Sequence, residues 1–416
     1  MRDPRDFDGR SDSKTAAPLA SRPGPGSPLA PARGWSSPRP GRDPRLATRL
    51  AFAVAGFASA CWAPLIPFAK ARLGVNDAQL GLLLLCLGVG SLVGVSASGL
   101  LAARIGARPI VIASGAGLSA LLPPLAIAAS PLALGATLLL FGACLGALDV
   151  AMNAHGAQVE AEAGVPLMSG FHALYSLGGG AGAAWMTVAL RAHISPQVGT
   201  LIAAVAALSL VGFGAFGLLA KRPIAPSRML VWPSGVVLLI AALAAIMFLA
   251  EGAVFDWSAL LLVERGLARR PEAGVGFMLF SIAMTGGRLV GDAVVRRFGG
   301  RRVVQVGTLT AIAGFLIVLC CPLAPVAIGG FLLVGLGAAN IVPVLFSAAG
   351  RQRDMPPTLA VAAVASTGYV GILAGPPVLG FIGQAVGLAG AFWLVTALLA
   401  FVALTGAAAA SEPKVG

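Results

Sequence analysis

From residue 46 onward the sequence is a succession of long apolar segments separated by short polar breaks. A helix needs about 20 apolar residues to cross the hydrocarbon core of a bilayer. Only structures that satisfy their own backbone hydrogen bonds can lie in lipid. We therefore predict an all-α membrane protein with twelve transmembrane helices. They are expected near 47–69, 78–102, 108–128, 131–155, 167–190, 196–219, 232–262, 272–295, 303–321, 324–349, 357–384 and 387–409.

The composition agrees with this class. Hydrophobic residues make up 57% of the 416 and charged residues 11%, whereas soluble domains contain about 25% charged residues. The net charge of +13 does not indicate nucleic-acid binding, because ten of the 29 Lys and Arg lie in the first fifty residues and no basic face follows. The five cysteines lie in apolar segments without a CxxC pattern, so we expect no metal and no cofactor.

The polar segments divide the chain. Residues 1–45 are rich in Pro, Gly, Ser and Arg, which predicts a disordered tail. The break at 220–231 separates an N-terminal six-helix bundle, 46–219, from a C-terminal one, 232–410, and residues 411–416 form a short tail.

Assigning alternate loops to opposite sides places twelve Lys and Arg on one side and six on the other. The positive-inside rule then predicts that the first side, which carries both termini, is cytoplasmic.

The two halves resemble one another at an offset of about 193 residues. GLLAARIGAR (99–108) aligns with DAVVRRFGGR (292–301), and LGALDV (145–150) aligns with LGAANI (336–341). The second alignment pairs Asp149 with Asn340, and a third pairs Tyr175 with Tyr369, the two tyrosines of the chain. A duplicated six-helix half is typical of secondary transporters.

The segment Gly99-Leu-Leu-Ala-Ala-Arg104-Ile-Gly106-Ala-Arg108 resembles the signature of the major facilitator superfamily, although Ala103 stands at its acidic position. Leu148-Asp149-Val-Ala-Met-Asn153 is similar to the fourth helix of the fucose-permease-like branch. The resemblance covers residues 46–410. It implies two pseudo-symmetric six-helix bundles in a bacterial inner membrane and transport by alternating access, not enzymatic catalysis.

Polar residues within the apolar segments are candidates for the substrate cavity, because ionisable groups in a bilayer usually face the bundle interior. We expect Asp149 to carry protons, with Asn153 one turn away, unless Asp149 only pairs helices. The other candidates for the cavity or for coupling are His172, Tyr175, Asn340, Tyr369, Trp62, Glu251 and Asp256. His172 and Tyr175 can equally serve interhelical hydrogen bonding. Glu251 and Asp256 can be solvated helix ends, and Trp62 and Trp257 can be interface anchors, which is the preferred interpretation for Trp257.

Arg288 and Asp292 are four residues apart, so one helical face can hold them as an ion pair. We predict that this pair closes a cytoplasmic gate together with neighbouring basic residues. Those residues are Arg104, Arg108, Arg297 and Arg301. Positive-inside topology alone explains some of these arginines.

The sequence therefore predicts a proton-coupled symporter of a sugar-like or other small polar solute. Proton-driven efflux of amphipathic compounds is the alternative, and a non-transporting membrane sensor is a third class. Expected partners are a small-molecule substrate, protons and the lipid bilayer, with no nucleic acid, and we expect a monomer.

Overall fold

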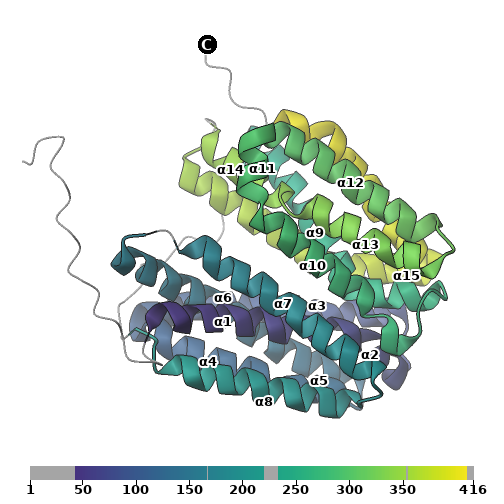
Figure 1. Cartoon of the computed structure of the whole chain (residues 1–416), viewed down its shortest axis with the longest axis horizontal. Helices are drawn as coiled ribbons and strands as arrows, with labels where there is room; N and C mark the ends of the chain where they lie inside the picture. The colour runs from purple at the N-terminus through teal and green to yellow at the C-terminus, as the bar shows by residue number, and fades with distance from the viewer. Residues whose placement is uncertain (1–42, 166, 220–232, 353–354, 410–416) are drawn as a thin grey trace, which may run out of the picture. The chain divides into compact units, whose positions relative to one another are not determined.

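The computed structural model describes residues 43–165, 167–219, 233–352 and 355–409. Residues 1–42 of the predicted tail, the predicted linker and the C-terminal tail lie outside these ranges. Every regular element within them is a helix (Figure 1). We call the elements before the linker the N-half and those after it the C-half.

The N-half contains eight α-helices and one 3₁₀ helix. They are α1 (Pro44–Ala60), η1 (Ala63–Leu65), α2 (Ile66–Leu73), α3 (Asp77–Ile105), α4 (Ala107–Ala120), α5 (Leu122–Ile127), α6 (Pro131–Ala163), α7 (Met168–Arg191) and α8 (Pro196–Ala215). The C-half contains η2 and seven α-helices. They are α9 (Val236–Glu264), η2 (Arg270–Glu272), α10 (Val275–Leu289), α11 (Gly291–Phe298), α12 (Gly300–Cys320), α13 (Ala324–Ala338), α14 (Ile341–Arg351) and α15 (Pro357–Ala409).

These helices make twelve membrane crossings. Nine helical segments of the described residues are long and apolar enough to span a bilayer, and the pair from Arg270 to Phe298, bent by 58°, makes a tenth. The 53-residue α15 is two crossings, because a straight helix of that length would measure about 80 Å and the backbone leaves the helical conformation at Gly387. The 24-residue α7 is the twelfth.

Four crossings that we expected to be continuous are broken, and proline or glycine lies at each break. The first is interrupted by η1 between α1 and α2, where Pro64 lies. The third is interrupted at Leu121 between α4 and α5, where Pro123 follows. The eighth bends at Val290, next to Gly291. The tenth breaks at Asn340 because Pro343 has no N–H to donate to the carbonyl of Ala339 one turn earlier.

The repeat extends to individual contacts. Gly106 and Gly299, which are 193 residues apart, both turn the chain between crossings with φ 79°, a conformation that favours glycine. Arg72 donates to the carbonyl of Leu125 over 2.9 Å, and to those of Ala126 and Ala128. At the same offset, Arg265 donates to the carbonyl of Val318. In each half, an equivalent arginine thus donates hydrogen bonds to backbone carbonyls at the end of the third crossing.

Glycines bring the helices of each half into backbone contact. A Cβ atom at Gly90 or Gly94 of α3 would collide with the backbone of α6, and one at Gly178 or Gly182 of α7 would collide with α1. Small residues allow such close approach in membranes, where packing replaces the hydrophobic effect as the driving force.

The two halves meet at the end of the helices that carries Lys70, which we call the Lys70 end. A Cβ atom at Gly81 of α3 would lie 2.6 Å from the carbonyl oxygen of Pro376 in α15. One at Gly274, which precedes α10, would lie 2.7 Å from Pro64 of η1. We call the opposite end, with the turns at Gly106 and Gly299, the Arg-rich end.

Candidate transport cavity

A cavity of about 460 Å³ lies between the halves. The N-half lines it with α1, α3, α6 and α7, and the C-half with α9, α10 and α15. Its polar lining residues are Ser59, Ser91, Asp149, Tyr175, Ser176, Glu251, Asp256, Ser281, Thr285, Arg288 and Tyr369. The cavity ends toward the Lys70 end where α3 and α15 touch at Gly81 and Pro376.

Asp149 is the carboxyl group that the N-half contributes to this cavity. One turn later on α6, the Asn153 amide donates to the Asp149 carboxylate over 3.2 Å and to its backbone carbonyl over 2.8 Å. Asn153 thereby orients Asp149. No guanidinium or ammonium group pairs with Asp149 among the described residues.

The repeat-related tyrosines both line the cavity, Tyr175 from α7 and Tyr369 from α15. Asp149 acts electrostatically on both hydroxyl groups, and Arg288 acts on Tyr175. The cavity therefore gathers tyrosine hydroxyls, carboxyl groups and one guanidinium from elements of both halves.

The C-half contributes an ion pair. Arg288 of α10 lies 3.6 Å from Glu251 of α9, measured between Nη2 and Oε2. The Arg288 Nε–H donates over 3.4 Å to the carbonyl of Ala339. This is the carbonyl that Pro343 leaves without its helical donor, so the break in the tenth crossing creates the acceptor that positions Arg288.

The predicted ion pair of Arg288 with Asp292 is not formed in this structure. The chain bends by 58° between α10 and α11, so residues four apart across the bend no longer share a helical face. Asp292 is exposed in the first turn of α11, and Arg288 pairs with Glu251 instead.

The four other predicted gate residues, Arg104, Arg108, Arg297 and Arg301, are all exposed at the Arg-rich end. The Arg297 guanidinium lies 5.6 Å from the ring of Phe298. Neither ion pair of the described residues, Lys70 with Asp77 and Arg288 with Glu251, involves these arginines. Their role in a gate stays a prediction.

Four candidates lie outside the cavity lining, and Asn153, which contacts Asp149 from one turn away, is the first of them. The Asn340 amide donates over 2.9 Å to the carbonyl of Gly287, so it joins the breaks of the eighth and tenth crossings. His172 lies on α7 with its ring edge-on to Phe52, 5.1 Å away between ring centroids. Trp62 is fully buried where η1 begins.

Trp257, which we expected to anchor at the membrane interface, is also fully buried. Its ring packs against Gly380 of α15, beside the junction with α3. The anchor interpretation is therefore wrong, because a side chain with no exposed surface cannot reach a lipid headgroup.

Two features of the site were not predicted. The first is an aromatic wall that lines the cavity from α9 and α10. It consists of Phe248, Phe255, Phe277 and Phe280. The rings of Phe255 and Phe277 are perpendicular with centroids 5.1 Å apart. The spacing of three between Phe277 and Phe280, and of seven between Phe248 and Phe255, marks one helical face in each case.

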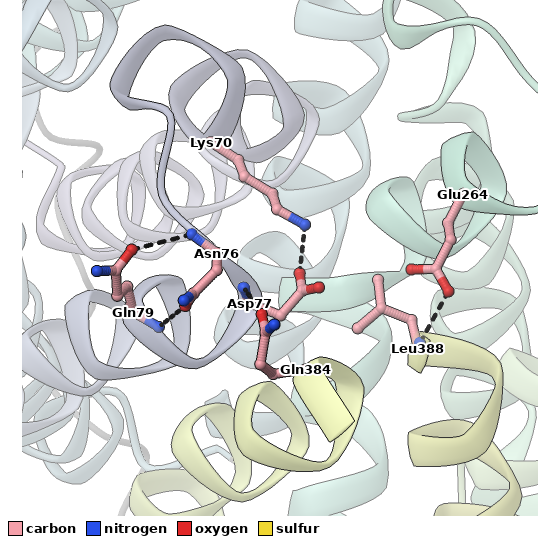
Figure 2. A network of polar contacts seen from close by, with 7 residues as sticks. All are labelled: Lys70, Asn76, Asp77, Gln79, Glu264, Gln384 and Leu388. Carbon is pink, nitrogen blue, oxygen red and sulfur yellow. Dashed lines mark hydrogen bonds and ion pairs between the residues drawn. The ribbon is translucent and has the colours of Figure 1, made fainter. Parts of the chain in front are cut away.

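The second is a polar network at the Lys70 end (Figure 2). Lys70 pairs with Asp77 over 2.5 Å, and the Asp77 backbone N–H donates over 3.2 Å to the Gln384 side chain. The second contact joins α3 to α15. Asn76 and Gln79 form a capping box at the start of α3. Their spacing in the sequence is the signal that could have located this helix start.

The sequence model of the protein family named Major Facilitator Superfamily matches residues 49–353 of this chain. The chain belongs to this superfamily. It is 43% identical over 373 residues to an uncharacterised MFS-type transporter of Yersinia pestis, which covers 89% of this chain and 97% of the relative. It is 31% identical to the membrane protein MosC of Rhizobium meliloti, over 85% of this chain and 86% of MosC. The protein is thus a multi-pass membrane transporter and not an enzyme.

Solved structures of this fold superpose on most of the transporter. A variant of the nucleoside transporter NupG gives a TM-score of 0.73 at 13% identity, with coverage of 89% of this chain and 100% of NupG. The inward-open xylose transporter XylE gives 0.71 at 12% identity, with coverage of 89% and 96%. A D-xylose–proton symporter gives 0.70 at 14%, with coverage of 87% and 96%. These likenesses show that the chain has the fold of these transporters.

Proposed function

We propose that this transporter moves a small polar solute together with protons by alternating access. The observation that carries the proposal is the cavity of about 460 Å³. Its ionisable lining comes from both halves, and it is bounded at the Lys70 end by direct contact between α3 and α15. Binding sites of secondary transporters lie near the bilayer midplane between their repeats.

The charge distribution supports an orientation with the Arg-rich end in the cytoplasm of a bacterial inner membrane. Arg104, Arg108 and Arg301 lie at this end, which corresponds to the side where both termini are expected. The hydrogen bond between Asp77 and Gln384, which links the halves, lies at the opposite end. We assign the structure to an inward-facing state on this basis.

Asp149 is the proposed proton carrier. It lines the cavity with a hydrogen bond from Asn153 and no cationic partner among the described residues. A carboxyl group in such surroundings can exist in either protonation state, because burial disfavours its charge. A D-xylose–proton symporter shares this fold, which agrees with proton coupling but does not identify a solute.

Proteoliposomes that contain a pH-sensitive dye test the proposal. Solutes from a panel of sugars, nucleosides and organic acids are added outside, one at a time. We expect at least one to drive proton movement through the wild-type protein. Asp149→Asn should abolish that movement, while exchange of labelled for unlabelled solute partly survives. Concentrative, pH-dependent transport by Asp149→Asn would show that the proton travels elsewhere, with Glu251 or Asp256 as the next candidates.

One observation favours efflux of amphipathic compounds as a second candidate function. Four phenylalanines line the C-half side of the cavity, which gives an apolar surface beside the charged groups. The direction of transport separates the two functions. An importer accumulates its solute in right-side-out vesicles with an inward proton gradient, whereas a proton-driven exporter depletes it.

A further inference from the structure

Arg288 lines the cavity from α10 with its guanidinium. Its Nε–H donates a long hydrogen bond of 3.4 Å to the carbonyl of Ala339, and its Nη2 lies 3.6 Å from Oε2 of Glu251. The Arg288 side chain is 38% exposed, whereas that of Glu251 is 19% exposed. Arg288 is the basic residue of the cavity lining, and its planar fork suits carboxylate groups.

Glu251 is poorly satisfied as the partner of this guanidinium. The separation of 3.6 Å exceeds a normal charged hydrogen bond. Its other oxygen, Oε1, is buried and accepts no hydrogen bond from the described residues. A void of about 10 Å³ borders Glu251 on the side away from the cavity, with Met247, Ala311 and Phe315 around it. A partly desolvated ion pair with an unsatisfied carboxylate oxygen gains little over its desolvation cost.

The aromatic wall adjoins this pair. Phe280 lines both the cavity and the small void behind Glu251, and it stacks on Phe277 with ring centroids 6.1 Å apart. A ligand whose anionic group reached Arg288 would therefore place its remaining atoms against phenylalanine rings.

We propose that Arg288 binds the anionic group of the transported solute in the position that the Glu251 carboxylate takes here. The solute is then a small organic anion, such as a carboxylate with an apolar or ring-bearing body. This proposal rests on the transport function proposed above and specifies its substrate class. In the transporter without solute, the Glu251 carboxylate pairs with the Arg288 guanidinium. The pair separates when a proton neutralises the carboxyl group.

The charges around Arg288 link anion binding to protons. Asp149 of α6 and Asp256 of α9 face the cavity together with Glu251. Tyr175 and His172 of α7 interact electrostatically with Arg288, and Tyr369 of α15 interacts with Asp149. Three carboxyl groups and one guanidinium give the fully ionised cavity a net negative charge. An anion therefore enters favourably only when carboxyl groups are protonated.

The acidic excess could also recruit an amine, which would bind Glu251 in place of Arg288. The structure favours the anion because the guanidinium is the more exposed partner of the pair and has a backbone carbonyl, that of Ala339, as a second contact. The amine is kept as an outcome of the test.

Equilibrium binding to the purified full-length protein tests the proposal with three probes of similar shape. These are benzoate, benzamide and benzylamine, measured by thermal shift and calorimetry at mildly acidic and mildly alkaline pH. Benzoate should bind best, and more tightly at the acidic pH. Arg288→Gln and Arg288→Lys should weaken benzoate about tenfold or more, since a charged bidentate contact contributes more than 1.4 kcal/mol. Glu251→Gln should bind it at least as tightly as the wild type, with a smaller pH dependence.

Arg302→Gln, an exposed arginine of α12, serves as the matched control and should bind like the wild type. The unliganded melting temperature of each variant reports its folding. Preference for benzylamine with loss in Glu251→Gln would replace the anion by an amine. Absence of benzoate binding in both the wild type and Glu251→Gln, or unchanged binding in folded Arg288→Lys and Arg288→Gln, would overturn the proposal. Because no transport is needed, these results are separate from the proton-movement experiment.

Discussion

At the scale of single residues, a buried histidine shows how polar side chains hold this membrane protein together. His155 of α6 accepts a hydrogen bond at Nε2 from the Leu219 backbone N–H over 2.9 Å. Its Nδ1 therefore carries the proton and donates to the Thr48 hydroxyl, 2.9 Å away, which donates in turn to the carbonyl of Pro44. The chain of bonds joins α6 to α1 and to the end of the sixth crossing.

We expect His155→Ala to lower stability, because it leaves the Leu219 N–H without its acceptor in a partly buried position. The cost of such an unsatisfied group is about 1–3 kcal/mol. The melting temperature of the purified protein measures it. His172→Ala, which removes an exposed histidine from α7, should have a smaller effect. Equal melting temperatures for wild type and His155→Ala would show that this network contributes nothing.

Residue type alone identified much of the cavity. Asp149, Glu251 and Asp256 were candidates because a carboxyl group in an apolar segment must face a polar interior, and all three line the cavity. The contact of Asn340 with Gly287 and the pairing of Arg288 with Glu251 could not be predicted. Both depend on the backbone breaks at Val290 and Asn340, and regular helical spacing does not extend across a break.

At the scale of elements, hydrophobic length predicted the number of crossings but not their shape. Twelve apolar segments lead to twelve crossings, while the ends moved by several residues, as in α6, which continues to Ala163 instead of residue 155. In the polar last turns of α6, Glu160 accepts hydrogen bonds from the backbone N–H groups of Leu167 and Met168, which lie at the start of α7. Local hydropathy carries no information about such a contact across a turn.

The equivalent arginines of the two halves give a prediction at this scale. Arg72→Ala removes three donors from the carbonyls at the end of α5, and Arg265→Ala removes a donor from the end of α12. Both variants should melt at lower temperature than the wild type, with Arg72→Ala losing more. Arg191→Ala, an exposed arginine at the end of α7, is the control. A larger loss in Arg265→Ala than in Arg72→Ala would contradict this order.

At the scale of the whole molecule, closure at the Lys70 end depends on how closely α3 approaches α15. Gly81 allows the approach, since a Cβ atom there would lie 2.6 Å from the Pro376 carbonyl oxygen. On the same helix, a Cβ atom at Gly99 would meet no atom of another described helix within 4 Å. The two glycines therefore form a matched pair for testing conformational change.

We expect Gly81→Leu to prevent closure and to favour the outward-facing state. A cysteine replaces Ser176, which lines the cavity, in a background without the five native cysteines. An impermeant thiol reagent is added to intact cells. Ser176→Cys should react slowly alone or with Gly99→Leu, and at least about tenfold faster with Gly81→Leu. Fast reaction of Ser176→Cys alone would refute the proposed orientation, and equal rates for the two glycine variants would refute the role of Gly81.

The equivalent arginine contacts also bear on how the protein is made. Arg72 reaches Leu125 within the N-half, and Arg265 reaches Val318 within the C-half. Neither contact requires the other half. The first six crossings can therefore reach their final packing while the ribosome is still synthesising the seventh, and assembly of the two halves becomes a late step of biogenesis in the membrane.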